Sequence, residues 1–140
     1  MGACAPRHND YSSFESLPEA GWAYGESIVF SPDGLDSVAL RSLGIALRHD
    51  NDYPYRNLWL EVTYGTPPSM HRDTVSIELA DIYGRWHGNG LGPSYQMAAT
   101  VDPAVTLSDS SRISIRHIMR VDTLRGIRQI GISVGPAVVR

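Results

Sequence analysis

One segment of the sequence has the spacing of a known nucleophile motif. Residues Gly131 to Gly135 read G-I-S-V-G, which matches the G-x-S-x-G turn that exposes a catalytic serine in α/β-hydrolases. That chemistry needs a helix after the serine and then an acid and a histidine further along the chain. Five residues follow Gly135 in this chain, and none is Asp, Glu or His. We therefore interpret Ser133 as an outward residue of a last strand.

Other patterns that hold phosphates or metals are incomplete. The glycine-rich stretch 84–92 lacks both the G-x-G-x-x-G spacing and a following lysine, so we interpret it as a long β-turn that carries an aromatic residue. No two of the five histidines lie within four residues of each other, which leaves no H-x-x-x-H ligand pair. Asp50 and Asp52 are interpreted as residues of Asx-type turns. The sequence predicts no metal, no cofactor and no catalytic residue.

A pair of catalytic carboxylates is the remaining possibility for hydrolytic chemistry. The positions of the candidate glutamates favour a structural role instead. Glu61 and Glu78 fall on outward phases of predicted strands. A glutamate in that position is usually solvated or is a cross-strand partner for arginine. We therefore predict that the protein is not an enzyme.

Aromatic and arginine side chains give the clearest binding chemistry. In a strand, Arg116 and Arg120 lie on one face, opposite Ile113 and Ile115. Such a face can dock an acidic partner surface, or it can be a solvated sheet face whose arginines pair with Asp and Glu. Exposed Trp and Tyr rings would alternatively form a platform for a glycan, although most rings in a small sandwich pack in its core or rim. The predicted binding surface consists of Tyr53, Tyr55, Trp59, Trp86, Arg116 and Arg120.

The single cysteine, Cys4, excludes a disulfide within the chain and follows two small residues, Gly2 and Ala3. Small residues before a cysteine are typical of bacterial lipoprotein signals, in which the cysteine receives the lipid. An apolar signal segment is expected before them. The alternative, N-myristoylation at Gly2, is disfavoured because Pro6 stands where that motif needs Ser or Thr. An incidental thiol is the remaining alternative.

The overall composition fits one globular domain of 140 residues and 15.4 kDa. A net charge of −3 argues against a nucleic-acid-binding protein, which would present a basic face. All 12 cationic residues are arginines. The absence of lysine excludes a Schiff base, a Walker A lysine and a Ser–Lys dyad.

Period-two alternation of apolar and polar residues dominates the chain after residue 25. It runs through segments 58–64, 74–79, 113–120 and 130–134, with Gly, Pro, Asn and Asp clusters between them. Segment 38–48 fits both helical and strand spacing. We predict a strand because Gly44 would destabilise a helix, with a bulge near Arg41 and Ser42. The predicted fold is all-β, an antiparallel β-sandwich of the jelly-roll or immunoglobulin-like type. Residues 1–20 are predicted to be a tether and residues 21–140 the sandwich.

Three blocks of residues, in order, resemble one known family. They are R-H-x-N-D-Y-P-Y-x-N-L-W-L from Arg48 to Leu60, L-A-D-x-x-G-R-W-x-G-x-G-x-G from Leu79 to Gly92, and M-R with a following G-I-x-x-I-G-I from Met119 to Ile132. Their order and spacing are similar to the gliding-motility lipoprotein GldH family of Bacteroidetes-type bacteria, from about Tyr24 to Val134.

The resemblance implies a lipid-anchored accessory protein of the cell envelope. Members of that family begin their mature chain at a lipidated cysteine shortly before the domain, and this position falls on Cys4. The expected partners are envelope proteins of a motility and secretion complex and, through the lipid on Cys4, a membrane. The expected location is the periplasmic side of the envelope. No catalytic residues are assigned to the family. A glycan-binding sandwich is the alternative function.

Overall fold

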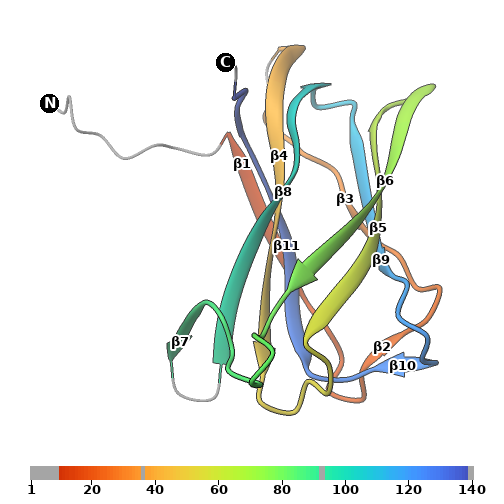
Figure 1. Cartoon of the computed structure of the whole chain (residues 1–140). Helices are drawn as coiled ribbons and strands as arrows, with labels where there is room; N and C mark the ends of the chain where they lie inside the picture. The colour runs from red at the N-terminus through yellow and green to blue at the C-terminus, as the bar shows by residue number, and fades with distance from the viewer. Residues whose placement is uncertain (1–9, 36, 92–93, 139–140) are drawn as a thin grey trace, which may run out of the picture.

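Two antiparallel sheets stack face to face in the computed structural model, which describes residues 10–35, 37–91 and 94–138 (Figure 1). The first sheet has the order β1 (Tyr11–Ser16), β11 (Ile127–Pro136), β4 (Ala39–Asp50), β8 (Ser94–Leu107) and β7 (Asn89–Leu91). The second has the order β3 (Ile28–Phe30), β9 (Arg112–His117), β5 (Asn57–Thr66) and β6 (Ser69–Glu78). A small ladder joins β2 (Trp22–Ala23) to β10 (Thr123–Leu124). No helix long and apolar enough to cross a membrane occurs in these residue ranges.

The connections between the strands identify the type of sandwich. Only β5 and β6 form a hairpin between long strands of one sheet, while the chain crosses between the sheets from β3 to β4, β4 to β5, β8 to β9 and β9 to β11. The resulting orders β1-β11-β4-β8 and β3-β9-β5-β6 are those of two interlocked Greek keys, the jelly roll. The predicted antiparallel β-sandwich is confirmed, and the strand order matches its jelly-roll form.

Alternation in the sequence builds the core as predicted. On β4, Leu43, Ile45 and Leu47 are buried, and on β5 Leu58, Leu60 and Val62 are buried against them. The residues between them on β5 face outward on the second sheet. Burial of one face of each strand therefore fixes the register and sets which residues of β5 and β9 are available to a ligand.

The ambiguous segment 38–48 is a strand, as predicted, and the irregularity lies where it was expected along β4. Register shifts occur at Arg41/Leu43 and Leu43/Gly44. The extra residues belong to the partner strand, since β4 advances from Arg41 to Leu43 while β8 moves from Val105 to Asp102. Pro103 explains this, because proline has no N–H for the ladder and is tolerated in a sheet at a bulge.

Strand β1 lies within the range that the sequence analysis assigned to the tether. It pairs with β11 over its whole length, from Tyr11 opposite Val134 to Ser16 opposite Gln129. Gly131 allows this close pairing, because a Cβ there would lie 2.6 Å from the ring of Phe14. The sheet therefore begins at Tyr11, earlier than the boundary drawn after residue 20.

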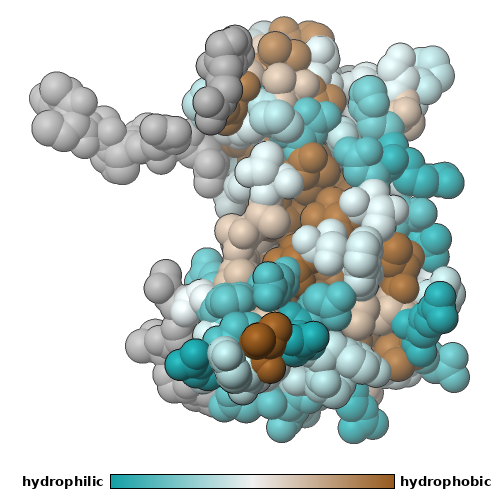
Figure 2. Space-filling model, viewed as in Figure 1, coloured by the Kyte–Doolittle hydropathy of each residue, from teal (hydrophilic) through white to brown (hydrophobic). Residues whose placement is uncertain are grey.

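The two ends of the sandwich carry different segments. We call the end where β1 starts and β11 finishes the terminal end; it also holds residues 31–35 and 37–38 and the turns at 67–68 and 108–111 (Figure 1). The opposite, distal end holds the connections 17–27, 51–56, 79–88 and 118–126. Along one side the core is incompletely covered between β6 and β8, where Val75, Met97, Ala99 and Val101 are half-buried, and Figure 2 shows hydrophobic atoms in the hollow on this side.

Candidate functional site

Four of the six residues predicted to bind a partner gather on the outer face of the second sheet, toward the distal end. Three of them line a groove of about 500 Å³, which we call the Trp59 groove. Its lining residues are Tyr55, Asn57, Trp59, Ile118, Met119 and Arg120. A second hollow of about 620 Å³ continues from it and is lined by Tyr24 and residues 118–122.

Two hydrogen bonds of its backbone fix the position of Trp59, and neither of them involves its side chain. It occupies an outward position of β5, where the indole is 42% exposed. Its carbonyl oxygen accepts a hydrogen bond of 3.0 Å from the Ile118 N–H, and its own N–H donates to Met119 Sδ at 3.3 Å. The segment that follows β9 thereby forms one wall of the groove. Arg120, on the same segment, is exposed.

Arg116 lies beside the groove and is already paired. Its Nε donates to Glu61 Oε1 at 2.8 Å across the β5–β9 ladder, and its guanidinium carbon lies 6.0 Å from the centre of the Tyr24 ring. The hydrogen bond from Arg116 holds the pKa of Glu61 below its ordinary value and raises that of Arg116. The pairing of sheet-face arginines with acidic residues, one of the alternatives drawn from the sequence, is what the structure shows for Arg116.

A buried histidine contacts the backbone of Met119, one of the residues that line the groove. His117 is fully buried, its Nε2 lies 3.0 Å from the Trp22 carbonyl oxygen, and its Nδ1 accepts the Met119 N–H at 3.3 Å. These two contacts together indicate that the His117 ring is neutral and that its proton is on Nε2. Burial lowers the pKa of His117, as it does for His49, which is also fully buried.

We expect acid to destabilise the protein through these two histidines. Their pKa values are lowered in the folded state, so the unfolded chain binds protons first as the pH falls. The contribution to stability is complete above pH about 6.5, the ordinary histidine value, and is lost below it by up to about 1.4 kcal/mol per pH unit for each ring. Urea unfolding at a series of pH values between 7 and 5 measures this loss, which should be smaller in His117→Gln. A stability that stays constant over this interval would contradict the assignment.

Tyr53 does not belong to the binding surface. It is only 3% exposed, its hydroxyl donates to the Asn57 carbonyl oxygen at 2.6 Å, and burial raises its pKa. Its ring packs edge to face against that of Tyr55, with centroids 5.7 Å apart. Tyr53 therefore positions Tyr55 at the groove from inside, and the prediction that Tyr53 is a surface residue is corrected.

Trp86 is half-buried in a separate aromatic cluster, with the rings of His49, Tyr53 and Tyr95. Its ring centroid lies 4.7 Å from that of His49, and its Nε1 donates to Asn51 Oδ1 at 3.0 Å. The loop before it is folded by Asp81, whose Oδ1 accepts the N–H groups of Tyr83 and Arg85 at 2.8 and 2.9 Å. The L-A-D-x-x-G-R-W block is thus a structural unit that seats Trp86, away from the lining of the Trp59 groove.

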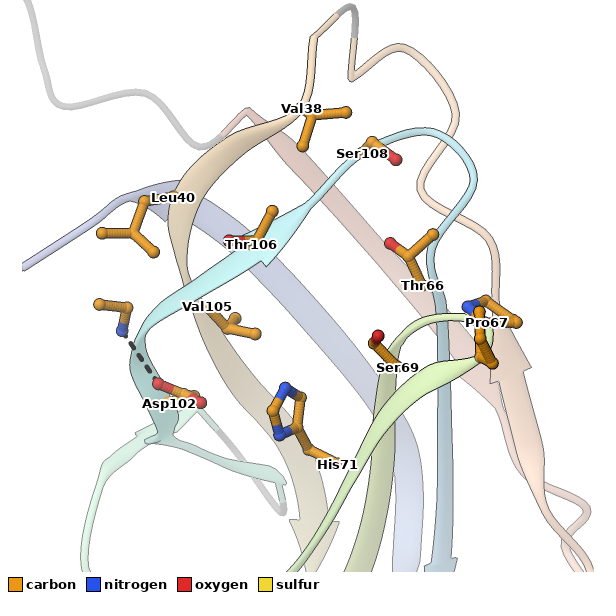
Figure 3. A pocket seen from close by; sticks show the side chains of 12 residues that line it. Val38, Leu40, Thr66, Pro67, Ser69, His71, Asp102, Val105, Thr106 and Ser108 are labelled. Atoms are coloured by element: carbon orange, nitrogen blue, oxygen red, sulfur yellow. Dashed lines mark hydrogen bonds between the residues drawn. The ribbon is translucent and has the colours of Figure 1, made fainter.

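Another hollow lies at the terminal end and includes none of the predicted site residues (Figure 3). It has a volume of about 640 Å³ and lies between the start of β4, the β5–β6 turn and β8. His71 from β6 and Asp102 from β8 lie at its rim. Next to it, the Tyr64 hydroxyl contacts carboxylate oxygens of Asp73 at 2.5 Å and Asp102 at 2.9 Å, and burial with these contacts raises the pKa of Tyr64. Strand alternation marks Tyr64 as a core residue but cannot reveal this bridge between β6 and β8.

Two of the patterns weighed in the sequence, a metal site and a serine nucleophile, can be compared with the described parts of the chain. No cluster of three His, Cys, Asp or Glu residues suited to a metal ion occurs among the residues that the structure describes. Ser133 is an ordinary position of β11, and Asp50 makes the expected Asx turn by accepting the Asp52 N–H at 2.9 Å. Cys4 lies outside the described residues.

Comparison with known proteins places the chain in a family. The family model described as "GldH lipoprotein" matches residues 9–134. A gliding motility lipoprotein GldH homolog of Christiangramia forsetii is 28% identical over 134 residues, covering 89% of this chain and 82% of that protein. The gliding motility lipoprotein GldH of Flavobacterium johnsoniae is 26% identical over 132 residues with the same coverage. Among solved structures, the Eiger TNF of S. frugiperda is 9% identical with a TM-score of 0.39, covering 95% of this chain and 97% of that one.

The matched range covers every strand of both sheets, apart from the last two residues of β11. It includes the three motif blocks from which the resemblance was first drawn, and with them Trp59 and Arg120 of the groove. The chain belongs to the GldH lipoprotein family of gliding-motility proteins.

Proposed function

We propose that the protein is a non-enzymatic accessory of the gliding-motility and secretion machinery that binds an envelope protein through the Trp59 groove. The observation that carries this proposal is the exposed ring of Trp59 in a groove of about 500 Å³ that Tyr55 and Arg120 also line. Trp, Tyr and Arg are the residue types most enriched where protein interfaces gain their affinity. Arg120 has no ion-pair partner among the described residues, so it can pair with a carboxylate of the partner.

The lipid on Cys4 and a periplasmic position complete the proposal. Membership in a lipoprotein family supports the anchor, and Cys4 is the only cysteine in the chain. One end of the protein would then be held at the membrane while the groove meets the partner.

Photo-crosslinking in the native host tests the groove. A photoreactive amino acid replaces Asn57, which lines the groove, or as a control Val29, which is exposed on the same sheet toward the terminal end. We expect a discrete product that contains an envelope protein from position 57 and none from position 29. Equal products from both positions, or no product from position 57, would reject the groove as the contact site.

A glycan ligand is the second candidate, because the groove combines two exposed rings with Asn57 and Arg120. Sugar rings stack on aromatic faces, and their hydroxyls bind planar polar groups of this kind. Binding of the purified protein to a glycan array that disappears in Trp59→Ala would favour this function. An array without signal, together with a protein crosslink from position 57, would exclude it.

A further inference from the structure

Exposed apolar side chains occur at both ends of the sandwich, and those at the terminal end are aliphatic. The terminal end carries aliphatic residues, with Val38 71% exposed and Leu40 52% exposed at the start of β4, and Met70 and Val138 close by in the topology. The distal end carries the exposed rings of Tyr24, Tyr55 and Tyr83, together with the exposed aliphatic side chain of Ile82. Leu and Val are under-represented among the residues that dominate protein–protein affinity, and exposed Leu side chains can enter the boundary between lipid headgroups and acyl chains.

The aliphatic rim surrounds an open hollow. Val38 and Leu40 line the cavity of about 640 Å³ from the start of β4, and Pro67 lines it from the β5–β6 turn (Figure 3). Charges of both signs are exposed at this end, with Arg72 and Arg112 at the same end as Asp33 and Asp109. The end therefore has an apolar character without an electrostatic preference for anionic lipid.

The proposed anchor enters the sandwich at this same end. Cys4 stands six residues before Asp10 in the sequence, a stretch that spans at most about 20 Å. The Asp10 N–H donates to the Val134 carbonyl oxygen, and the Asp10 carboxylate pairs with Arg41, the residue next to Leu40. A lipid on Cys4 would therefore hold Leu40 and its neighbours close to the bilayer.

We propose that the terminal end lies against the membrane surface, with Val38, Leu40 and Met70 in the boundary between lipid headgroups and acyl chains. This proposal rests on the lipid anchor of the proposed function. Strand β5 reaches the terminal end at Thr66, seven residues after Trp59, so Trp59 would be held roughly 23 Å from that end, facing the envelope space.

Nitroxide accessibility on the acylated protein tests this orientation. The full chain, with its lipid on Cys4, is reconstituted into phosphatidylethanolamine vesicles, with and without phosphatidylglycerol. Because Cys4 carries the lipid, a new cysteine at Val38, Met70 or Tyr83 is the only free thiol and takes the spin label. We expect labels at 38 and 70 to collide with oxygen and to be shielded from a water-soluble nickel complex, and the label at 83 to show the reverse. Phosphatidylglycerol should leave the result unchanged.

Matched variants separate docking from anchoring. With the label at Met70, the Leu40→Ser substitution should restore access of the nickel complex, whereas Ile82→Ser, an exposed isoleucine at the distal end, should not. Equal nickel access at positions 38, 70 and 83 in the acylated protein would overturn the docking proposal while leaving the anchor intact. A chain that carries no lipid on Cys4, established by mass before reconstitution, would instead contradict the anchor on which docking rests.

Discussion

The Cys4→Ser variant should leave the membrane and appear in the soluble fraction of the cell envelope. Each acyl CH₂ group buried in a bilayer contributes about 0.8 kcal/mol, so the long chains proposed on Cys4 would supply the main membrane affinity. The few aliphatic side chains of the terminal end cannot replace that contribution. Cell fractionation of the full precursor, with labelled palmitate to detect the lipid, measures the effect.

Leu40→Ser is the control for Cys4→Ser. It removes an exposed apolar contact but keeps the cysteine, and we expect the variant to remain in the membrane fraction. If Cys4→Ser fractionates with the membrane as the wild type does, the protein is not anchored through this residue. Loss of palmitate label without a change in fractionation would show that a different contact retains it.

Gly126→Ala should destabilise the protein by about 3 kcal/mol or more, combining backbone strain with a steric clash. Gly126 has φ +97°, which disfavours any residue with a Cβ, and a Cβ there would lie 2.5 Å from Tyr53 Cα. Both sides of this contact are backbone, so no flexible side chain can move away. The Gly126 carbonyl oxygen accepts the Asp50 N–H at 2.9 Å, which joins the two connections that seat Tyr53 behind Tyr55.

Gly25→Ala isolates the cost of backbone conformation alone. Gly25 also has positive φ, +87°, but a Cβ there would meet no heavy atom within 4 Å. We expect this variant to lose only about 1–2 kcal/mol. Urea denaturation midpoints of the two variants, with an unchanged slope, give the comparison. Equal losses would show that the approach of Gly126 to Tyr53 does not support the distal end.

Local sequence patterns were sufficient to predict those strands in which apolar and polar residues alternate over many positions. Period-two alternation identified β5 with Trp59 facing outward, and Gly44 argued correctly for a strand at β4, because burial of one sheet face leaves a strong local signal. The Asx turn at Asp50 was equally local. These features depend on residues near one another in the chain.

Features that depend on the meeting of distant segments could not be predicted in this way. Tyr53 follows a turn, where alternation gives no phase, and its burial depends on Gly126, which is 73 positions away (126 − 53). Trp86 and Trp59 look alike in the sequence, but the Asp81 loop directs Trp86 to His49 instead. The bulge at Arg41 was placed correctly along β4, yet its extra residues come from β8, because the partner strand and Pro103 were not identifiable locally.

The central claim is that the protein binds its partner through the Trp59 groove. It is tested by measuring which envelope proteins are recovered from native membranes with the Trp59→Ala variant. Trp59 and Phe14 are almost equally exposed, at 42% and 41%, but Phe14 lies on the first sheet, so Phe14→Ala is the matched control. Loss of a central interface tryptophan costs about 2 kcal/mol or more, a reduction in affinity of roughly thirtyfold. We predict that the proteins crosslinked to wild type and to Phe14→Ala are lost with Trp59→Ala, at equal amounts of folded, membrane-bound protein. Equal recovery with all three proteins would contradict the account.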